Sequence, residues 1–258
     1  MRKPSIGSDR VEAPSPAGSV GAQHASSEAH ATAGLFATLL MSVACAALVG
    51  CATSRSEVKL DTPAMAPPGA AVATTPAPAR GFAVIRMVKD ERVFEQAPGD
   101  PSVPSLGGEG AQQATAETKL RAIGRKRNAF GQALGDVLLQ SGQTVETVVR
   151  GALTEAFRLS GYQVVDATVA APAALVVDAR IKDCWAWMNP GFWSVTVNTR
   201  IATDLAIAGV PGTSRVEVHH QEGRQLVTDG TWIEVAQVAL QKWREEAVKK
   251  LQTLPPGQ

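Results

Sequence analysis

The clearest indication of the fold is the alternation of apolar and polar residues through residues 175–207, LVVDARIKDCWAWMNPGFWSVTVNTRIATDLAI. Because successive side chains of a strand point to opposite faces, this period of two predicts two long, half-buried strands. One face of the first strand is predicted to carry Leu175, Val177, Ala179, Ile181, Asp183, Trp185 and Trp187, opposite Asp178, Arg180 and Lys182. The matching face of the second carries Trp193, Val195, Val197, Ile201, Leu205 and Ile207, opposite Ser194, Thr196, Asn198, Arg200 and Asp204.

The connection between these strands is constrained by parity, because cross-strand partners share a face of the sheet. Opposing Trp187 to Trp193 or Val195 requires an odd number of connecting residues, whereas a two-residue Pro-Gly hairpin would oppose Trp187 to Ser194. The sequence therefore predicts a three- or five-residue turn, with Gly191 in the left-handed conformation.

The flanking segments add further strands and two helices. Residues 82–88 and 162–165 are apolar and predict strands, and residues 215–220 predict another, continued by 225–227. Apolar residues at helical spacing follow Thr144 and Gly230-Thr231, and Gly161 and Pro255 end these two helices. Residues 96–118 are interpreted as a long loop, and 130–140 as a short helix or strand. The expected fold is a single α+β domain over residues 81–254, with two helices packed on one face of a mostly antiparallel sheet of about five strands.

The N-terminal part contains a candidate lipoprotein signal. Residues 34–50 form an uncharged apolar run that ends in Leu48-Val49-Gly50-Cys51. A spanning helix needs roughly 20 apolar residues, so this run is short for one and favours a signal segment over residues 34–51 with lipidation at Cys51. An uncleaved membrane anchor and a buried helix of a soluble domain are the alternatives. Residues 1–33 are rich in Ser, Ala, Gly and Pro and are expected to be a disordered extension.

The residues after Cys51 indicate where a lipidated chain would lie. In lipoproteins that this chain resembles, Asp after the lipidated cysteine retains the protein at the inner membrane. Ala52 stands there, which favours lipid anchoring to the outer membrane, on its periplasmic face. Residues 52–80 are rich in Pro and Ala and predict a tether that would span about 30 Å as a flexible coil.

Composition excludes several classes of function. The net charge is +1 with 19% charged residues, which does not suggest nucleic-acid binding. Of three cysteines, only Cys184 would remain free in a processed, lipidated chain, so no disulfide or zinc cluster is expected. We expect no metal site and no cofactor.

The Trp-rich hairpin is the main candidate contact site for a partner or ligand. Its candidate residues are Trp185, Trp187, Met188, Phe192 and Trp193. Aromatic residues at a hairpin tip can contact lipid, glycan or protein. The favoured alternative places all three tryptophans under the helices, which leaves Met188 and Phe192 on the opposite face as the better exposed contacts.

Three other features have a structural and a functional interpretation. The basic residues Lys119, Arg121, Arg125, Lys126 and Arg127 suggest either a solvated loop, which is favoured, or an anion-binding patch that Asp90 and Glu91 would partly neutralise. Asp183 is expected to be a hydrogen-bonded structural carboxylate rather than a catalytic acid, and Cys184 an inert thiol on the polar face. No catalytic residue is assigned.

Four short motifs resemble the YajG-like family of bacterial lipoproteins. They are Val88-Lys89-Asp90-Glu91-Arg92, Ile123-Gly124, Gly161-Tyr162-Gln163-Val164 and Leu175-Val176-Val177-Asp178. The resemblance covers residues 84–251 and departs from the family pattern in a long insertion between Arg92 and Lys119. It implies an envelope location and an α+β fold, and it transfers no activity.

The sequence therefore leads to a functional expectation without catalysis. We expect a non-enzymatic, lipid-anchored adaptor or accessory subunit of an envelope assembly, with the membrane and an envelope protein as its partners. The alternatives are a module that binds a small ligand or glycan through the same aromatic residues, and an enzyme that uses Asp183 or Cys184.

Overall fold

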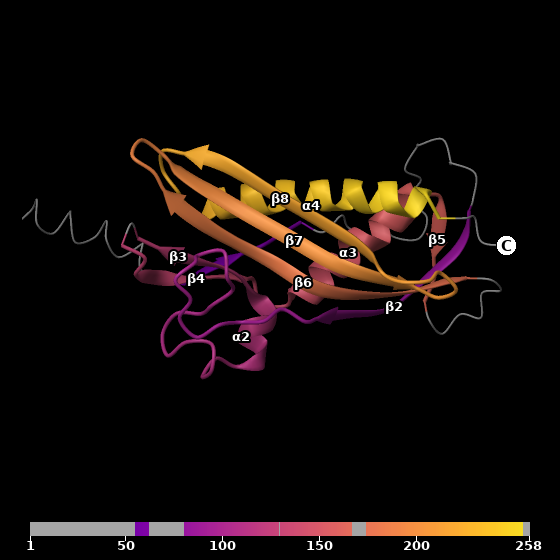
Figure 1. Ribbon diagram of the computed structural model, residues 1–258, viewed down its shortest axis with the longest axis horizontal. Coiled ribbons are helices and arrows are strands. Elements are labelled where there is room, and N and C mark those ends of the chain that lie inside the picture. Colours follow the sequence, from indigo (N-terminus) through magenta and orange to yellow (C-terminus); the bar gives the residue numbers. More distant parts are fainter. Residues whose placement is uncertain (1–54, 62–79, 129, 167–173, 255–258) are drawn as a thin grey trace, which may run out of the picture. The chain divides into compact units, whose positions relative to one another are not determined.

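The computed structural model describes residues 55–61, 80–128, 130–166 and 174–254 (Figure 1). The expected extension, signal segment and Cys51 lie outside them, as do residues 62–79. The strands are β1 (Ser56–Val58), β2 (Gly81–Asp90), β3 (Ala122–Arg127), β4 (Ala133–Leu139), β5 (Tyr162–Val164), β6 (Leu175–Pro190), β7 (Val195–Ile207) and β8 (Ser214–Arg224). The helices are α2 (Ala116–Arg121), α3 (Val145–Leu159) and α4 (Asp229–Gln252). None of the helices described is long and apolar enough to cross a membrane.

The fold class is α+β, but the sheet is mixed rather than mostly antiparallel. Its described strands number eight. The β6–β7–β8 meander and the β3–β4 hairpin are antiparallel. Four pairings are parallel: β1 with β4, β2 with β5, β2 with β6, and β3 with β6. The expected count of five strands omitted β1, β3 and β4. The basic residues of β3 suggested a loop, and residues 130–140 had been left open between helix and strand.

Residues 55–61 correct the expected tether. Ser56 and Val58 pair in parallel with β4, and Val58 and Leu60 are only 1% and 3% exposed. The side-chain amide of Gln143 holds Leu60 at both its backbone N–H and its carbonyl. The short alternation of buried Ser56, Val58 and Leu60 with exposed neighbours is a strand pattern that the adjacent Pro-rich composition had obscured.

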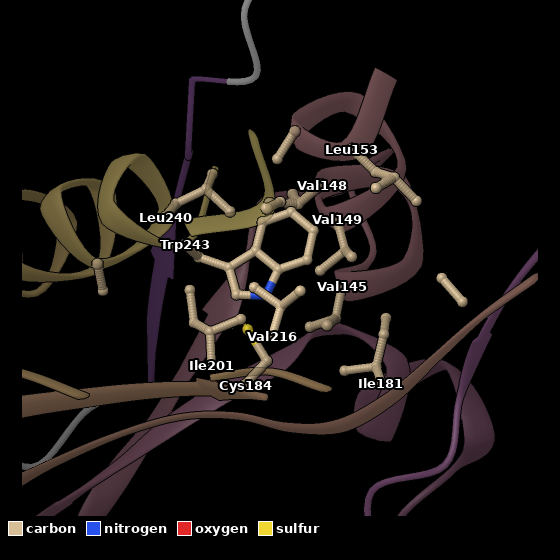
Figure 2. Packing of buried hydrophobic residues seen from close by; sticks show 14 of the residues in the cluster. Val145, Val148, Val149, Leu153, Ile181, Cys184, Ile201, Val216, Leu240 and Trp243 are labelled. Atoms are coloured by element: carbon tan, nitrogen blue, oxygen red, sulfur yellow. The ribbon is translucent and has the colours of Figure 1, made fainter. Parts of the chain in front are cut away.

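Helices α3 and α4 cover one face of the sheet, as expected (Figure 1). Helix α3 begins with a capping box between Thr144 and Thr147, and Gly161 follows its end at φ 87°. Helix α4 contributes Trp243, which is fully buried at the centre of the packing in Figure 2. The apolar stripes of both helices therefore form one core with the sheet face beneath them.

A β-bulge at Lys182 changes which side chains of β6 face the helices. Ile181 pairs with Thr203 and Asp183 with Ala202, so Lys182 is an extra residue without a partner on β7. Figure 2 shows Ile181 and Cys184 on the same side of the sheet, toward Trp243. The single alternation predicted for this strand is therefore wrong beyond Ile181, because the bulge reverses the facing of every later residue.

The bulge coincides with a change of neighbour along one edge of β6. Strand β2 pairs with β6 only as far as Ile181, and β3 takes over at Ala186 through Gly124. By contrast, β7 pairs with β8 without a register shift, and Val197, Ile201, Leu205 and Ile207 are buried on one face as predicted. The broken alternation of β6 therefore coincides with a change of neighbouring strand, which is a feature of the tertiary structure.

The β6–β7 turn also differs from the expectation. Pro190 pairs with Val195, so four residues connect the strands and Trp187 opposes Asn198. Gly191 donates its N–H to the carbonyl of Ser194 at 2.8 Å, and its φ is not in the left-handed region. A Cβ at Gly191 would lie 2.8 Å from that carbonyl oxygen, so the glycine provides close approach rather than an unusual backbone angle.

Gly124 allows β3 to approach β6, and its substitution provides a stability test. A Cβ built at Gly124 lies 2.7 Å from the carbonyl oxygen of Ala186, a backbone atom that cannot rotate away. We expect Gly124→Ala to lower the free energy of unfolding by about 1–3 kcal/mol through overpacking, measured by urea denaturation. Gly99→Ala is the control, because nothing lies within 4 Å of its Cβ position. Equal stability of the two variants would contradict the close contact.

Candidate functional site

The Trp-rich hairpin has a buried part and an exposed tip. Trp185 is fully buried on the sheet face opposite the helices, not under them as expected. Residues 92–115 cover this face: Phe94 packs edge-to-face on Trp185 at 6.0 Å, and the indole N–H donates to the carbonyl of Pro101 at 3.1 Å. Trp185 is thus a structural anchor for the long insertion.

Trp187 is also enclosed, with an exposed fraction of 6%. His219 stacks against its ring at 5.3 Å and 17°, and the Arg200 guanidinium lies 5.4 Å from the ring centroid. A 3.0 Å hydrogen bond joins Nε2 of the histidine to Oδ1 of Asn198, which accepts it, and fixes the ring. These contacts leave Trp187 unavailable as a stacking platform for a ligand.

The exposed part of the hairpin is its tip. Phe192 and Trp193 are 90% and 85% exposed and contact each other edge-to-face at 4.8 Å. Phe192 was expected to be exposed, but Trp193 was expected on the apolar face. Met188 was expected to be an exposed contact, yet the bulge turns it toward the helices, where it packs against the core.

Two further exposed apolar residues, which local sequence patterns did not indicate, lie at the same end of the sheet as this tip. Phe130 in the β3–β4 turn is 90% exposed, and Leu226 after β8 is 74% exposed. Strand β3 runs parallel to β6, and Arg224 pairs with Val195, so both turns and the end of β8 lie at the same end of the sheet (Figure 1). We call Phe130, Phe192, Trp193 and Leu226 the apolar rim.

Asp183 forms an ion pair with Arg200. The guanidinium Nε donates to Asp183 Oδ2, and Arg200 also reaches the carbonyl of Ser102 at 3.3 Å. Burial raises the pKa of the Asp183 carboxyl, and the hydrogen bond from Arg200 opposes that shift. Asp183 therefore sits in a structural ion pair beneath residues 92–115. Separately, the part of the chain that the structure describes contains no group of three or more metal-ligating side chains.

Cys184 lies on the helix side of β6, not on the polar face as expected, and is 5% exposed. Burial raises the pKa of its thiol to about 12. We therefore expect iodoacetamide at pH 8 to leave Cys184 unmodified in the folded protein and to alkylate it after unfolding in guanidinium, because the thiolate is the reactive form. Peptide mass spectrometry would measure both, and rapid alkylation of the folded protein would contradict the buried position.

The basic cluster is folded into α2 and β3 rather than forming a loop. Arg121 donates to the carbonyl of Leu139 and to the carboxylate of Glu57. Arg127 donates to the carbonyl of Pro98 and to the hydroxyl of Ser105. Lys126 is 7% exposed and lies 3.2 Å from Asp229. These partners hold the cationic groups within the fold.

The carboxylates expected to neutralise that cluster pair elsewhere. Asp90 binds Arg92, and Glu91 binds Lys182 at 2.7 Å. The cluster therefore forms part of the framework around β3 and does not form a separate anion-binding patch.

The solved structures that resemble this chain include two of low similarity. One is the crystal structure of an uncharacterised protein, with 11% identity, a TM-score of 0.33, and coverage of 69% of this chain and 95% of that one. The other is protein XCC0632 from Xanthomonas campestris, described under the family model DUF330, with 10% identity, a TM-score of 0.37, and coverage of 77% and 93%. No family model and no curated protein matches the chain. Similarity at this level assigns neither a family nor a function.

Proposed function

We propose that this protein is a lipid-anchored envelope lipoprotein, held at the periplasmic face of the outer membrane, that acts as a non-enzymatic adaptor or accessory subunit. The observation that carries the proposal is Leu48-Val49-Gly50-Cys51 at the end of an uncharged apolar run, just before a folded domain. Ala52 and the YajG-like motifs support the outer-membrane location.

The corrected start of the domain changes how the anchor would hold it. Arg55 is already in the domain, where its guanidinium lies 3.5 Å from Asp136. Four residue steps separate Arg55 from Cys51, which limits the two Cα atoms to about 14 Å. A lipidated Cys51 would therefore keep β1 close to the bilayer surface instead of placing the domain at the end of a long tether.

The chemistry of the described residues supports a non-enzymatic role. The two candidate catalytic groups have structural surroundings: Asp183 pairs with Arg200, and the Cys184 thiol is buried under the helices. A glycan platform loses its main support as well, because His219 stacks on Trp187 and Phe94 packs on Trp185. An adaptor needs only surfaces for its partners.

Two surfaces are open to partners. One is the apolar rim. The other is the free edge of β8, which pairs with β7 alone among the described strands. Exposed charges on β8, including Arg215 and Glu217, would discourage self-pairing at this edge while giving a protein partner specific contacts.

Fractionation of expressing cells tests the proposed anchoring. We expect the wild-type chain to sediment with outer membranes and Cys51→Ala to be lost from that fraction, because two or three acyl chains anchor a protein stably, whereas a single weak membrane contact binds reversibly. Cys45→Ala is the matched control, since it alters a cysteine in the same apolar run and should leave the distribution unchanged. Outer-membrane retention of Cys51→Ala would overturn the proposal.

A further inference from the structure

We propose that the apolar rim inserts into the surface of the membrane that holds Cys51, and so fixes the orientation of the domain. This inference rests on the proposed lipidation and adds a second, non-covalent contact with the same bilayer. Exposed Phe130, Phe192, Trp193 and Leu226 come from three separate connections that the topology brings to one end of the sheet.

The rim has the composition of a lipid contact. Residues 128–135, 188–199 and 225–228, which include its three connections, contain no Asp, Glu, Lys or Arg. Aromatic side chains favour the membrane–water interface, where the ring is partly buried among lipids and its polar edge stays hydrated. A rim without charge also predicts binding that depends little on anionic lipid or on salt.

The position of β1 allows the anchor to reach the same end. Strand β1 runs parallel to β4, and β4 starts at the β3–β4 turn that carries Phe130, so β1 also starts on its rim-facing side. Ser56 pairs with Val137, four residues beyond the start of β4 at Ala133, which corresponds to about 13 Å along the strand. Five residue steps separate Ser56 from Cys51 and can span about 17 Å, enough to reach the level where β4 starts, at the end of the turn that carries Phe130.

Lipid is a better occupant of the rim than a protein partner for two reasons. An anchor of this length holds the rim next to the bilayer at high effective concentration, so even weak insertion is favoured. The rim side chains also lie on three separate turns, so they can insert side by side without needing a complementary pocket. The β8 edge is then left for a protein partner.

Tryptophan fluorescence in vesicles can test the insertion, because Trp193 is the exposed tryptophan of the described domain. Trp185, Trp187, Trp232 and Trp243 are each 6% exposed or less. The full-length chain, purified from membranes, would be reconstituted in vesicles of phosphatidylcholine brominated near the top of one acyl chain. We expect bromine quenching in the wild type and its loss in Trp193→Phe.

Two matched variants move the exposed tryptophan from position 193 to position 130 or position 159. In the Trp193→Phe background, Phe130→Trp should restore quenching because it lies on the rim. Leu159→Trp should not restore it, because Leu159 is 52% exposed at the end of α3, where Tyr162 pairs with Gly81 at the opposite end of the sheet. This pattern is the expected result.

The other outcomes would overturn the inference, and they separate it from the proposed function. Mass analysis of the same preparation shows whether Cys51 is acylated. Acylated protein without quenching of the rim tryptophans would refute insertion and leave the lipoprotein intact. Shielding of Trp193 from acrylamide without bromine quenching would assign the rim to contact with a second copy of this chain. An unacylated chain would remove the proposed function and this inference together.

Discussion

Arg92→Leu is expected to lower the free energy of unfolding by about 3–5 kcal/mol, because it leaves a buried carboxylate without its cation. The Arg92 side chain is fully buried, and its Nε and Nη2 atoms donate to Asp90 at 2.9 and 2.7 Å. The same guanidinium donates to the carbonyls of Lys119, Ala122 and Cys184. It therefore fills the junction where β6 changes its neighbour from β2 to β3.

Urea or guanidinium denaturation would measure this effect, with Arg86→Leu as the matched control. Arg86 also pairs with an aspartate, Asp178, but its side chain is 63% exposed. Solvent screens such a pair, so the control should lose much less stability than Arg92→Leu. Similar losses in the two variants would contradict the buried position of Arg92 at the junction between β2, β3 and β6.

Trp185→Ala is expected to cost about 3–5 kcal/mol, the range for truncating a large buried aromatic side chain. The loss should be concentrated in residues 92–115, because the indole contacts Phe94 and the carbonyl of Pro101. Native-state hydrogen exchange should show lost protection of Glu95, whose amide donates to Pro104, with less change in α3.

Trp193→Ala is the comparison from the same hairpin. Trp193 is 85% exposed, so its truncation should change the free energy of unfolding by less than about 0.5 kcal/mol. The two alanine variants therefore separate the structural tryptophan from the exposed one. A large loss in Trp193→Ala, or lost protection in α3 instead of residues 92–115, would contradict the face assignment.

Local patterns predicted the elements whose partners do not change along their length. Helix α3 follows its Thr144 cap, α4 follows its apolar stripe, and β7 keeps one alternation throughout. Strand β6 does not, because its neighbour changes halfway and the bulge at Lys182 accommodates the change. A single-strand pattern carries no information about such a junction.

The rim and β3 were missed for different physical reasons. Phe130 and Leu226 are isolated apolar residues in sequence, and only the parallel pairing of β3 with β6 and the pairing of β8 with β7 bring them to the same end of the sheet as Trp193. The charges of Arg121 and Arg127 suggested a solvated loop, but distant carbonyls and hydroxyls satisfy them within the fold. Charge alone is therefore a poor guide to exposure when tertiary partners are unknown.

The most direct test of the account is the mass of the N-terminal peptide from membrane fractions of expressing cells, compared between the wild type and Cys51→Ala. The account predicts a chain that begins at a diacyl- or triacyl-modified Cys51, and the loss of this species in the variant. An unmodified chain that retains residues 34–50 would contradict lipid anchoring and remove the main support for the adaptor role.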